Sequence, residues 1–401
     1  MTWIKKKLGE VLTIERGGSP RPIDKYLTNS PDGINWIKIS DATASDKCIF
    51  ETKEKITKEG LHKTRMVNEG DFILSNSMSF GRPYIMKTLG CIHDGWLVLK
   101  EKGQKIFDTE FLYYLLSSPY VFNQFDYLAA GSTVRNLNIA LVSSVEVPIP
   151  PLPEQQSIVS ILDEAFAAIA RANTNAEQNL KNAKELFESY LQGVFENGDW
   201  ETKTLKELTT KIGSGATPRG GQESYKSEGI SLVRSMNVHD WEFRERNLAF
   251  IDEKQAKELD GVTLQEEDVL LNITGASVAR CCVFPKEYLP ARVNQHVSII
   301  RPKKELLDAK FLNLLLTSKP YKDQLLFTGE QGATRQAITK AQIESFRISI
   351  PPLKEQQTIV RQLDALRAET QKLETIYQQK LLNLEELKKS VLQRAFAGEL
   401  T

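Results

Sequence analysis

An eleven-residue segment that occurs twice constrains this chain more than any other feature. The sequence IPPLPEQQSIV at Ile149–Val159 returns as IPPLKEQQTIV at Ile350–Val360, 201 positions later, with nine of the eleven residues identical. The duplication divides the 401 residues into two matching halves. Each half has a region of mixed pattern followed by a long stretch without proline. We therefore expect two similar domains, each followed by a long helix.

The repeat extends beyond this segment at low identity. Trp3 and Trp200 begin matching stretches, and each half then has a turn rich in glycine and proline. Core positions are kept while the loops between them differ, as expected of two copies that bind different things. The matching segments are Gly17–Pro22 with Gly213–Gly220, Glu69–Arg82 with Glu266–Arg280, Phe111–Tyr120 with Phe311–Tyr321, and Gly131–Leu137 with Gly332–Ile338.

Within each half, the pattern predicts an α+β domain. Short apolar and β-branched runs bounded by Gly, Asp and Asn indicate strands. They are INWIKIS, DFILSN and GWLVLK in the first half, and ISLVRSM, DVLLNIT and HVSIIRP in the second. FLYYLLSS and FLNLLLTS indicate short helices that a nearby proline ends. A domain of this size can form its own core.

The proline-free stretches predict two long helices, from Glu154 to about Asn197 and from Lys354 to Ala397. Apolar residues recur there in alternating steps of four and three, which is the pattern of a coiled-coil seam. The first seam is rich in alanine and the second in leucine. Small side chains on one helix leave room for large ones on the other, so we expect the two helices to pack as an antiparallel pair.

Both polar and apolar residues occupy the expected seams. Asn179 and Lys380 would be polar seam residues that fix the register. Leu186 and Tyr190 would lie in the first seam, and Leu387 in the second.

Composition indicates an ordinary globular protein, with 41% hydrophobic and 26% charged residues. The N-terminus MTWIKKKLGE lacks the apolar core of a signal peptide, and no run of eighteen apolar residues occurs. We therefore expect a cytoplasmic protein. The four cysteines and four histidines show no metal-ligand spacing, so we expect no metal site. The net charge of zero does not by itself favour nucleic acid, so any DNA binding must come from local cationic clusters.

Several enzyme signatures are absent from the sequence. The two IPPL segments have Leu where an adenine methyltransferase needs an aromatic ring to stack on the flipped base. GSGATPRG has Arg219-Gly220 where a phosphate-binding loop needs Lys and Ser or Thr. Glu154 and Glu355 lie in the first helical turn, where we expect helix capping rather than catalysis. The sequence therefore predicts a binding protein rather than an enzyme, with no catalytic residue and no cofactor of its own.

Two variable domains, each followed by a PPL-x-EQQ-x-I helix, resemble the specificity (S) subunit of type I restriction-modification systems. The resemblance covers the whole chain, and GGSPRP, GSGATPRG, NITGASVARCCVFP and VNQHVSIIRP are similar to target-recognition sequence of that family. It implies two target-recognition domains related by pseudo-twofold symmetry and joined by two long helices packed as an antiparallel coiled coil. The expected boundaries are residues 1–150 and 198–351 for these domains, and 151–197 and 352–401 for the helices, which serve as spacer and docking surface.

The resemblance also implies the partners. Each domain would read one half of a split, asymmetric double-stranded DNA target. The helices would dock two methyltransferase (M) subunits. In systems that also cleave DNA, restriction/translocase (R) subunits would join the complex. S-adenosylmethionine, ATP and Mg²⁺ would belong to those partners. Two alternatives stay open: a coiled-coil scaffold whose variable domains bind a ligand other than DNA, and a stand-alone enzyme whose site matches no recognised motif.

Direct reading of DNA needs polar and cationic side chains presented on loops. Two polar clusters that follow strands fit this need, as do the loops before the long helices and several isolated cations. For His296 there are two alternatives, a structural role, which is the more common one for such a histidine, and a base contact. The candidates are Arg21, Lys38, Ser75, Asn76, Ser77, Ser79, Arg82, Ser132, Arg135, Arg219, Arg234, Asn272, Thr274, Ser277, Arg280, Asn294, Gln295, Thr334 and Arg335.

Overall fold

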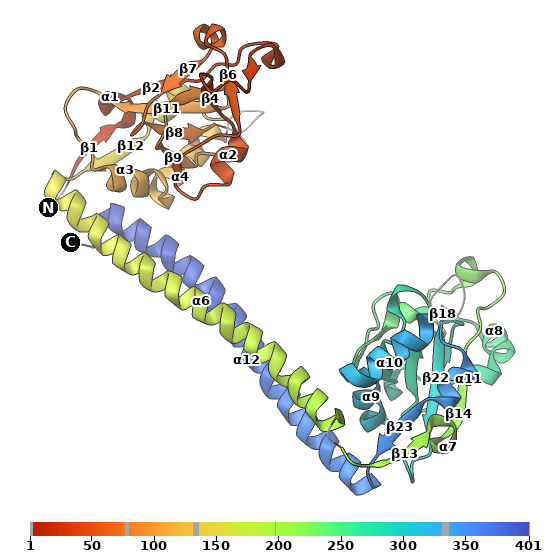
Figure 1. Cartoon of the computed structure of the whole chain (residues 1–401). Helices are drawn as coiled ribbons and strands as arrows, with labels where there is room; N and C mark the ends of the chain where they lie inside the picture. Colours follow the sequence, from red (N-terminus) through yellow and green to blue (C-terminus); the bar gives the residue numbers. More distant parts are fainter. Residues whose placement is uncertain (1–2, 77–79, 131–135, 197, 331–336, 401) are drawn as a thin grey trace. The chain divides into compact units, whose positions relative to one another are not determined.

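The computed structural model describes residues 3–76, 80–130, 136–196, 198–330 and 337–400. The chain divides into two compact units. Unit 1 is Met1–Glu177 with Gln379–Thr401, and unit 2 is Gln178–Gln378. Each unit therefore contains one mixed domain together with parts of two long helices, α6 (Leu152–Glu196) and α12 (Leu353–Ala397) (Figure 1).

Unit 1 is built in layers. A sheet of order β2-β11-β8-β9-β5 packs against a second sheet of order β3-β6-β4-β10-β7. Ile73 and Val98 face the second sheet, whereas Phe72 and Leu97 face the helices. This alternation follows from the period of two in a strand. The strands are β1 (Ile4–Lys7), β2 (Leu12–Arg16), β3 (Leu27–Thr28), β4 (Ile34–Ile37), β5 (Cys48–Ile49), β6 (Glu54–Ile56), β7 (Arg65–Val67), β8 (Phe72–Ser75), β9 (Pro83–Met86), β10 (Gly90–Ile92), β11 (Trp96–Glu101) and β12 (Glu146–Ile149).

Unit 2 repeats this layering with smaller sheets. A sheet of order β14-β22-β19-β20 lies between the helices and a sheet of order β18-β15-β21. The strands are β13 (Glu201–Thr204), β14 (Thr209–Ser214), β15 (Ile230–Val233), β16 (Val238–His239), β17 (Glu242–Phe243), β18 (Ala249–Ile251), β19 (Val269–Asn272), β20 (Cys281–Val283), β21 (Ala291–Val293), β22 (Val297–Pro302) and β23 (Arg347–Ile350).

The short helices cap the sheets at matching places. Pro119 and Asp108 show how the sequence starts them: proline opens α4, and the Asp108 carboxylate accepts from two backbone N–H groups of α3. The predicted α+β class is confirmed, and the six predicted strands are present, although INWIKIS ends as a strand at Ile37. The helices are α1 (Leu8–Val11), α2 (Ile39–Thr43), α3 (Thr109–Leu116), α4 (Pro119–Ala129), α5 (Ile139–Ser144), α7 (Leu205–Leu208), α8 (Glu253–Glu258), α9 (Ala309–Thr317), α10 (Lys319–Glu330) and α11 (Lys340–Ser345).

The long helices run antiparallel, as predicted. In unit 1, Ile158 near the start of α6 shares a core with Phe396 near the end of α12. In unit 2, Phe195 near the end of α6 shares a core with Ile359 near the start of α12. In both units these ends also pack against the mixed domain, so the helices and the domain form one core.

The predicted seam is wrong in the C-terminal half of each long helix. Leu186 and Tyr190 are exposed, and Phe187 and Leu191 are buried in their place. Phe187 makes an edge-to-face contact with Trp241 of the domain, with ring centroids 5.3 Å apart. The apolar face of α6 therefore turns towards the domain there instead of following a strict seven-residue repeat along the other helix. Asn179, Lys380 and Leu387 are likewise exposed.

The duplicated PPL-x-EQQ segment anchors each long helix to its domain. The Gln155 side chain is fully buried, accepts from Asp108 N at 2.7 Å and donates to the carbonyls of Ile106 and Pro150, both at 2.9 Å. Gln356 repeats this pattern, accepting from Asp308 N at 2.9 Å and donating to two carbonyls. A glutamine can satisfy both kinds of buried backbone group at once. Its duplication therefore has a structural cause.

The neighbouring glutamates make a second anchor. Trp3 Nε1 donates to Glu154 Oε1 at 2.9 Å, and Trp200 Nε1 donates to Glu355 Oε1 at 3.3 Å. These carboxylates lie in the first helical turn, where a negative charge also favours the helix dipole. They bind the first tryptophan of each repeat to its long helix.

Candidate nucleic-acid interface

The glycine-proline turns lie against the same element in both units. Gly17 N donates to Trp96 O at 3.0 Å, and Gly215 N donates to Val297 O at 3.1 Å. A Cβ at Gly17 would lie 2.0 Å from His93 O, and one at Gly215 would lie 1.8 Å from Val293 O. Only glycine permits this approach. The turn is thereby held beside the residues that follow β10 in unit 1 and β21 in unit 2.

A hydroxyl in each turn then binds a side chain of that following segment. Ser19 Oγ donates to Asp94 Oδ1 at 2.7 Å, and Thr217 Oγ1 donates to Gln295 Oε1. The hydrogen bond from Ser19 lowers the pKa of Asp94. Arg21, two residues further on, is 82% exposed and 3.5 Å from Asp94 Oδ2. Arg219 occupies the matching place and is also exposed.

Two more predicted cations lie at this edge. β4 pairs in parallel with β10, and β15 with β21, so the residues after them meet at one end of the sheet. Lys38 follows β4 and lies 2.5 Å from Glu54 Oε1. Arg234 follows β15, donates to Asn247 O at 2.5 Å and lies over the Tyr225 ring. We call this end of each domain, formed by the residues after β2, β4, β8 and β10 or after β14, β15, β19 and β21, its reading edge.

Four predicted contact residues belong to the fold instead. Ser75, Asn76, Asn272 and Asn294 have at most 6% of their surface exposed. Asn76 Nδ2 donates to Asp94 O at 2.8 Å, and Asn272 Nδ2 donates to Ser235 O at 2.9 Å. These side chains hold neighbouring loops of the reading edge together. Because all four side chains are buried, the described fold does not present them to a ligand at the edge.

The remaining polar candidates of unit 2 line a shared surface pocket. Thr274 Oγ1 lies 2.6 Å from His296 Nδ1, and Ser277 and Arg280 lie on the same pocket wall. Gln295 is exposed beside it. His296 therefore has a structural partner in Thr274 and also faces the pocket. The described lining is Ser235, Met236, Thr274, Gly275, Ala276, Ser277, Arg280 and His296.

Arg82 in unit 1 is held differently from Arg280. Its guanidinium donates to Asp46 O at 3.2 Å and lies over the Tyr84 ring, 5.2 Å from its centroid. Its side chain is 45% exposed, so it can still meet a ligand. Six further candidates lie outside the described residues: Ser77, Ser79, Ser132, Arg135, Thr334 and Arg335.

Some edge residues were not among the sequence candidates. Ser19, His93 and Asp94 in unit 1 and Thr217 and Met236 in unit 2 all lie at the edge. The signal that could have found the hydroxyls was present. Aligning GGSPRP with GSGATPRG on their glycines places Ser19 opposite Thr217 and Arg21 opposite Arg219.

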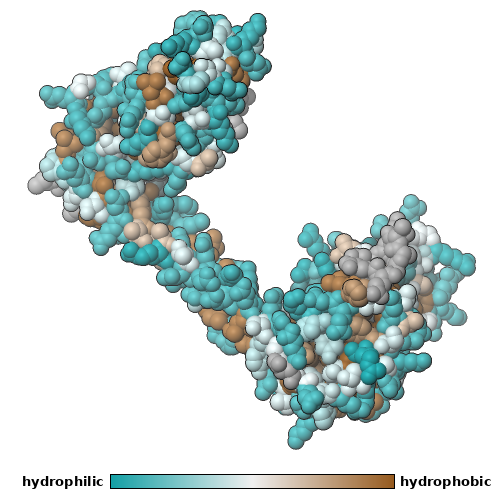
Figure 2. All heavy atoms as spheres, in the orientation of Figure 1, coloured by the Kyte–Doolittle hydropathy of each residue, from teal (hydrophilic) through white to brown (hydrophobic). Residues whose placement is uncertain are grey.

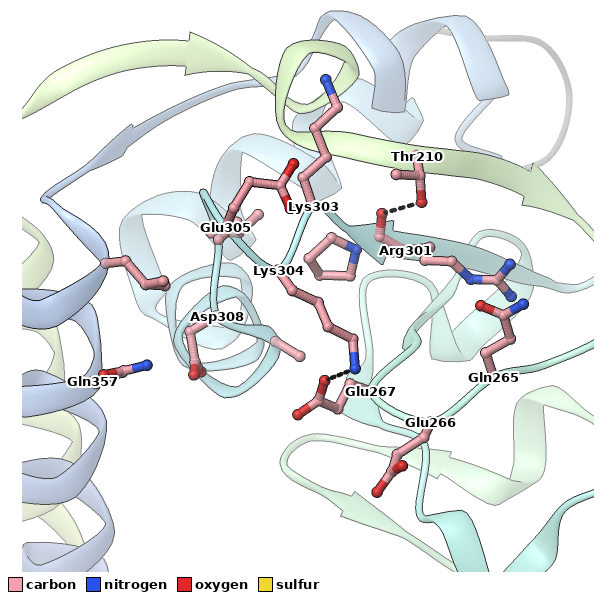
Figure 3. A pocket seen from close by; sticks show the side chains of 14 residues that line it. Thr210, Gln265, Glu266, Glu267, Arg301, Lys303, Lys304, Glu305, Asp308 and Gln357 are labelled. Atoms are coloured by element: carbon pink, nitrogen blue, oxygen red, sulfur yellow. Dashed lines mark hydrogen bonds and ion pairs between the residues drawn. The ribbon is translucent and has the colours of Figure 1, made fainter.

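A different hollow in unit 2 lies where the domain meets α12 (Figure 3). Lys304 Nζ lies 2.5 Å from Glu267 Oε2 across it, and Glu266, Glu305 and Asp308 add further negative charge. Cations and carboxylates are mixed there, so this hollow offers no field that would attract phosphates. Gln357 of α12 faces it from the helix side (Figure 3).

In the described part of the chain, no cluster of three or more His, Cys, Asp or Glu side chains could hold a metal ion. Nor does any described helix have the length and apolar character needed to cross a membrane.

Both halves of the chain match one known protein family. Residues 1–182 and 197–383 each match the family model described as type I restriction modification DNA specificity domain. The chain belongs to this family. The type I DNA specificity domain therefore occurs twice in it, in agreement with the duplicated sequence.

Relatives and solved structures match this chain along nearly its whole length. The chain is 26% identical to the putative type I restriction enzyme MjaX specificity subunit of Methanocaldococcus jannaschii, covering 99% of this chain and 93% of that protein. It is 22% identical to the EcoBI specificity subunit of Escherichia coli, covering 100% and 86%. The fold matches the HsdS subunit from Thermoanaerobacter tengcongensis with a TM-score of 0.68 at 21% identity, covering 99% and 97%. A chain from a type I R-M system gives a TM-score of 0.73, also at 21% identity, covering 100% and 98%.

Proposed function

We propose that this chain is the non-catalytic DNA-recognition subunit of a type I restriction-modification complex. Each domain reads one half of a split double-stranded DNA target. The observation that carries the proposal is the pair of reading edges, which share one frame but present different side chains. Unit 1 offers Arg21, Lys38 and His93, whereas unit 2 offers Arg219 and a pocket lined by hydroxyls. Different side chains prefer different bases, so the target is asymmetric.

The charge balance indicates that partner subunits supply part of the affinity for DNA. With 52 cations against 52 carboxylates, the chain lacks the excess positive charge that dominates phosphate binding. The cations at the reading edges give local contacts, and the modification subunits would supply the rest. S-adenosylmethionine, ATP and Mg²⁺ would likewise be bound by those partner subunits, with R subunits joining in systems that cleave DNA.

The experiment is co-expression with the methyltransferase subunit of the same system, followed by single-molecule sequencing of host DNA for N6-methyladenine. A split, asymmetric motif that appears only when this chain is present supports the proposal. A soluble complex with an active methyltransferase but no new methylation would overturn it in favour of a scaffold that binds another ligand.

The long helices support the docking half of the proposal. Besides the exposed pair Leu186 and Leu387, eight exposed positions at helical spacing carry the same residue on both helices, and we call these eight the shared stripe. They are Gln156, Asp163, Ala167, Thr174, Gln178, Asn182, Glu185 and Ser189 on α6, and Gln357, Asp364, Ala368, Thr375, Gln379, Asn383, Glu386 and Ser390 on α12. Each unit holds one complete set, taken partly from each helix. On the face drawn in Figure 2, the helices show mainly hydrophilic residues with apolar ones between them.

Folding explains only part of this identity. Asp163 and Asp364 bond to side chains of their domains, and Gln178 and Gln379 donate to Asn182 and Asn383. Substitutions at exposed helix positions usually change stability by less than about 0.5 kcal/mol. Other exposed positions have indeed diverged, even in charge: Lys184 stands opposite Glu385, and Glu188 opposite Lys389. Exposed polar residues that are retained while their neighbours change point to binding. We therefore propose that the shared stripe docks two copies of one partner, the M subunit.

The chain contains its own control for this docking. Asn182→Lys and Asn383→Lys each place a cation in the stripe. Asn179→Lys makes the same change three residues away, at an exposed position where the other helix already has Lys380. Native mass spectrometry should find two M subunits on the wild type and on Asn179→Lys. It should find one on either stripe variant, at the same concentration, and none on the double variant. Two M subunits on every variant would exclude the stripe as the docking surface.

A further inference from the structure

The reading edge of unit 1 contains an apolar pocket whose lining identifies one kind of base. We infer that this pocket receives the major-groove edge of a thymine, with the 5-methyl group against its apolar floor. The inference rests on the proposed DNA-reading function and adds the base that unit 1 selects at one position. The described lining is Ser19, Pro20, Arg21, Ile23, Trp36, Lys38, Ile39, Ser40 and His93.

The floor of this pocket is apolar. Pro20 and Trp36 are buried beneath it, and Ile23 and Ile39 are partly exposed. Partly exposed isoleucines beside two cations leave apolar surface in water that a ligand can cover. A methyl group in the major groove is the one apolar group that a base pair presents there, and only thymine has it among the four bases.

The rim of the pocket presents hydrogen-bond donors. Arg21 and Lys38 are cationic, and both side chains are substantially exposed. His93 Nδ1 accepts from Gly95 N at 2.9 Å, and burial lowers the pKa of His93, so the neutral ring carries its proton on Nε2. No carboxylate belongs to the described lining. The nearby Asp94 already accepts from Ser19 and Arg21.

This combination of an apolar floor and a donor rim selects among the bases. Thymine presents the O4 acceptor next to its methyl group, which matches both parts. Cytosine and adenine present an amino donor, which would face the two cations, and only the Ser19 and Ser40 hydroxyls of the described lining could accept from it. Guanine presents two acceptors but no methyl, and its polar edge would cover the isoleucines. Thymine is therefore the base that matches both the apolar floor and the cationic rim of this pocket.

In unit 2, the same backbone frame carries a pocket with a different lining. Its pocket begins at the matching place after β15, where Ser235 stands opposite Ile39. Hydroxyls of Ser235, Thr274 and Ser277 line it, and each can donate or accept. The substitution Ile39→Ser thus gives unit 1 a residue that the same frame already accepts in unit 2.

The test uses the complex of the full chain with M subunits and the target found by methylation sequencing. Each thymine of the target is replaced in turn by deoxyuridine, which lacks only the methyl group. At one position the dissociation constant of the wild-type complex should rise about fourfold, the loss expected for one buried methyl. The Ile39→Ser complex should bind the two DNAs equally at that position. Phe50→Ser, which removes a 68% exposed apolar side chain away from the pocket, should keep the difference.

The outcomes separate the inference from the proposed function. If scrambling a half-site weakens binding but no deoxyuridine replacement does, the thymine pocket is wrong and DNA reading stands. The pocket is also wrong if Ile39→Ser and Phe50→Ser keep the same methyl dependence. If scrambling either half-site leaves binding unchanged, the proposed function itself fails. Thermal unfolding of each variant shows that the fold is retained.

Discussion

The two reading edges share a backbone frame and differ in the side chains placed on it. A glycine turn, a hydroxyl and an exposed arginine follow one another in both units. The Ser19 hydroxyl meets the carboxylate of Asp94, whereas Thr217 meets the neutral amide of Gln295. His93 stands in unit 1 where Asn294 stands in unit 2. Under the proposed function, the frame would fix where a ligand is met, and these exchanges would change which ligand is preferred.

A similar contrast lies at the opposite ends of β8 and β19 from the reading edges. Asp268 and Arg301 form a bidentate ion pair with distances of 2.7 and 2.8 Å, and the Asp268 side chain is fully buried. The matching pair in unit 1, Asp71 and Lys100, is 3.3 Å apart and more exposed. Both aspartates also accept from a backbone N–H three residues earlier. The same position therefore carries a stronger interaction in unit 2.

The largest expected effect is a difference in stability between the two units when these ion pairs are removed. Asp268→Ala leaves the Arg301 guanidinium without its buried partner and should lower the free energy of unfolding of unit 2 by about 3–5 kcal/mol. Asp71→Ala should cost unit 1 less, about 1.5–3 kcal/mol. Hydrogen exchange with mass spectrometry measures the two units separately in the full chain. Equal losses in the two units would show that the ion pairs are equivalent.

A second pair of changes should act equally on the two units. Gln155→Ala and Gln356→Ala each leave buried backbone groups without partners and should lower the free energy of unfolding of the affected unit by about 2–3 kcal/mol. Gln156→Ala and Gln357→Ala, at the exposed neighbouring positions, should change it by less than about 0.5 kcal/mol. The same exchange measurement applies. A loss in one unit only would mean that the helix anchors differ.

Changes at the edges should separate the two halves of the target. Arg280→Ala should weaken binding by about 1–3 kcal/mol for the half-site read by unit 2, and Arg82→Ala should do so for the other half-site. Equilibrium binding to DNA with either half-site scrambled measures each contribution. The assignment fails if either variant weakens recognition of both half-sites equally, or of neither.

The smallest expected effect is a pH dependence confined to unit 1. Burial lowers the pKa of His93 below its ordinary value of 6.5, while Asp94 opposes and Lys38 adds to this shift. The unfolded chain therefore takes up the proton first as the pH falls. Unit 1 should be unaffected by this group above about pH 6.5 and should lose stability below it.

His93→Asn supplies the residue that unit 2 has at this place and should remove that part of the pH dependence. Hydrogen exchange of unit 1 at several pH values between about 5 and about 7.5 compares the variant with the wild type. An unchanged slope in the variant would assign the pH dependence to other groups.

The sequence predicted the frame well because the frame depends on pattern. Period-two apolar runs became strands, and the buried glutamines explain why PPL-x-EQQ recurs. The reading edge was predicted less well. Ser75, Asn76 and Asn272 follow strands just as exposed polar residues do, and only the packing of a distant loop turns them inward. Ser19 and Asp94 are 75 residues apart, so their pairing required the sheet register. Leu186 does not lie in the seam as predicted, because Phe187 is turned inward there and packs against Trp241 of the domain.

The most direct test of the account replaces one reading domain by the other. Residues 4–149 would be inserted in place of residues 201–350, since both segments begin and end on paired strands of matching register. Methylation sequencing of cells that express this chain with its M subunit then gives the new target. The account predicts a split motif whose two half-sites carry the same bases. Retention of the original asymmetric motif would contradict the claim that each domain reads its own half.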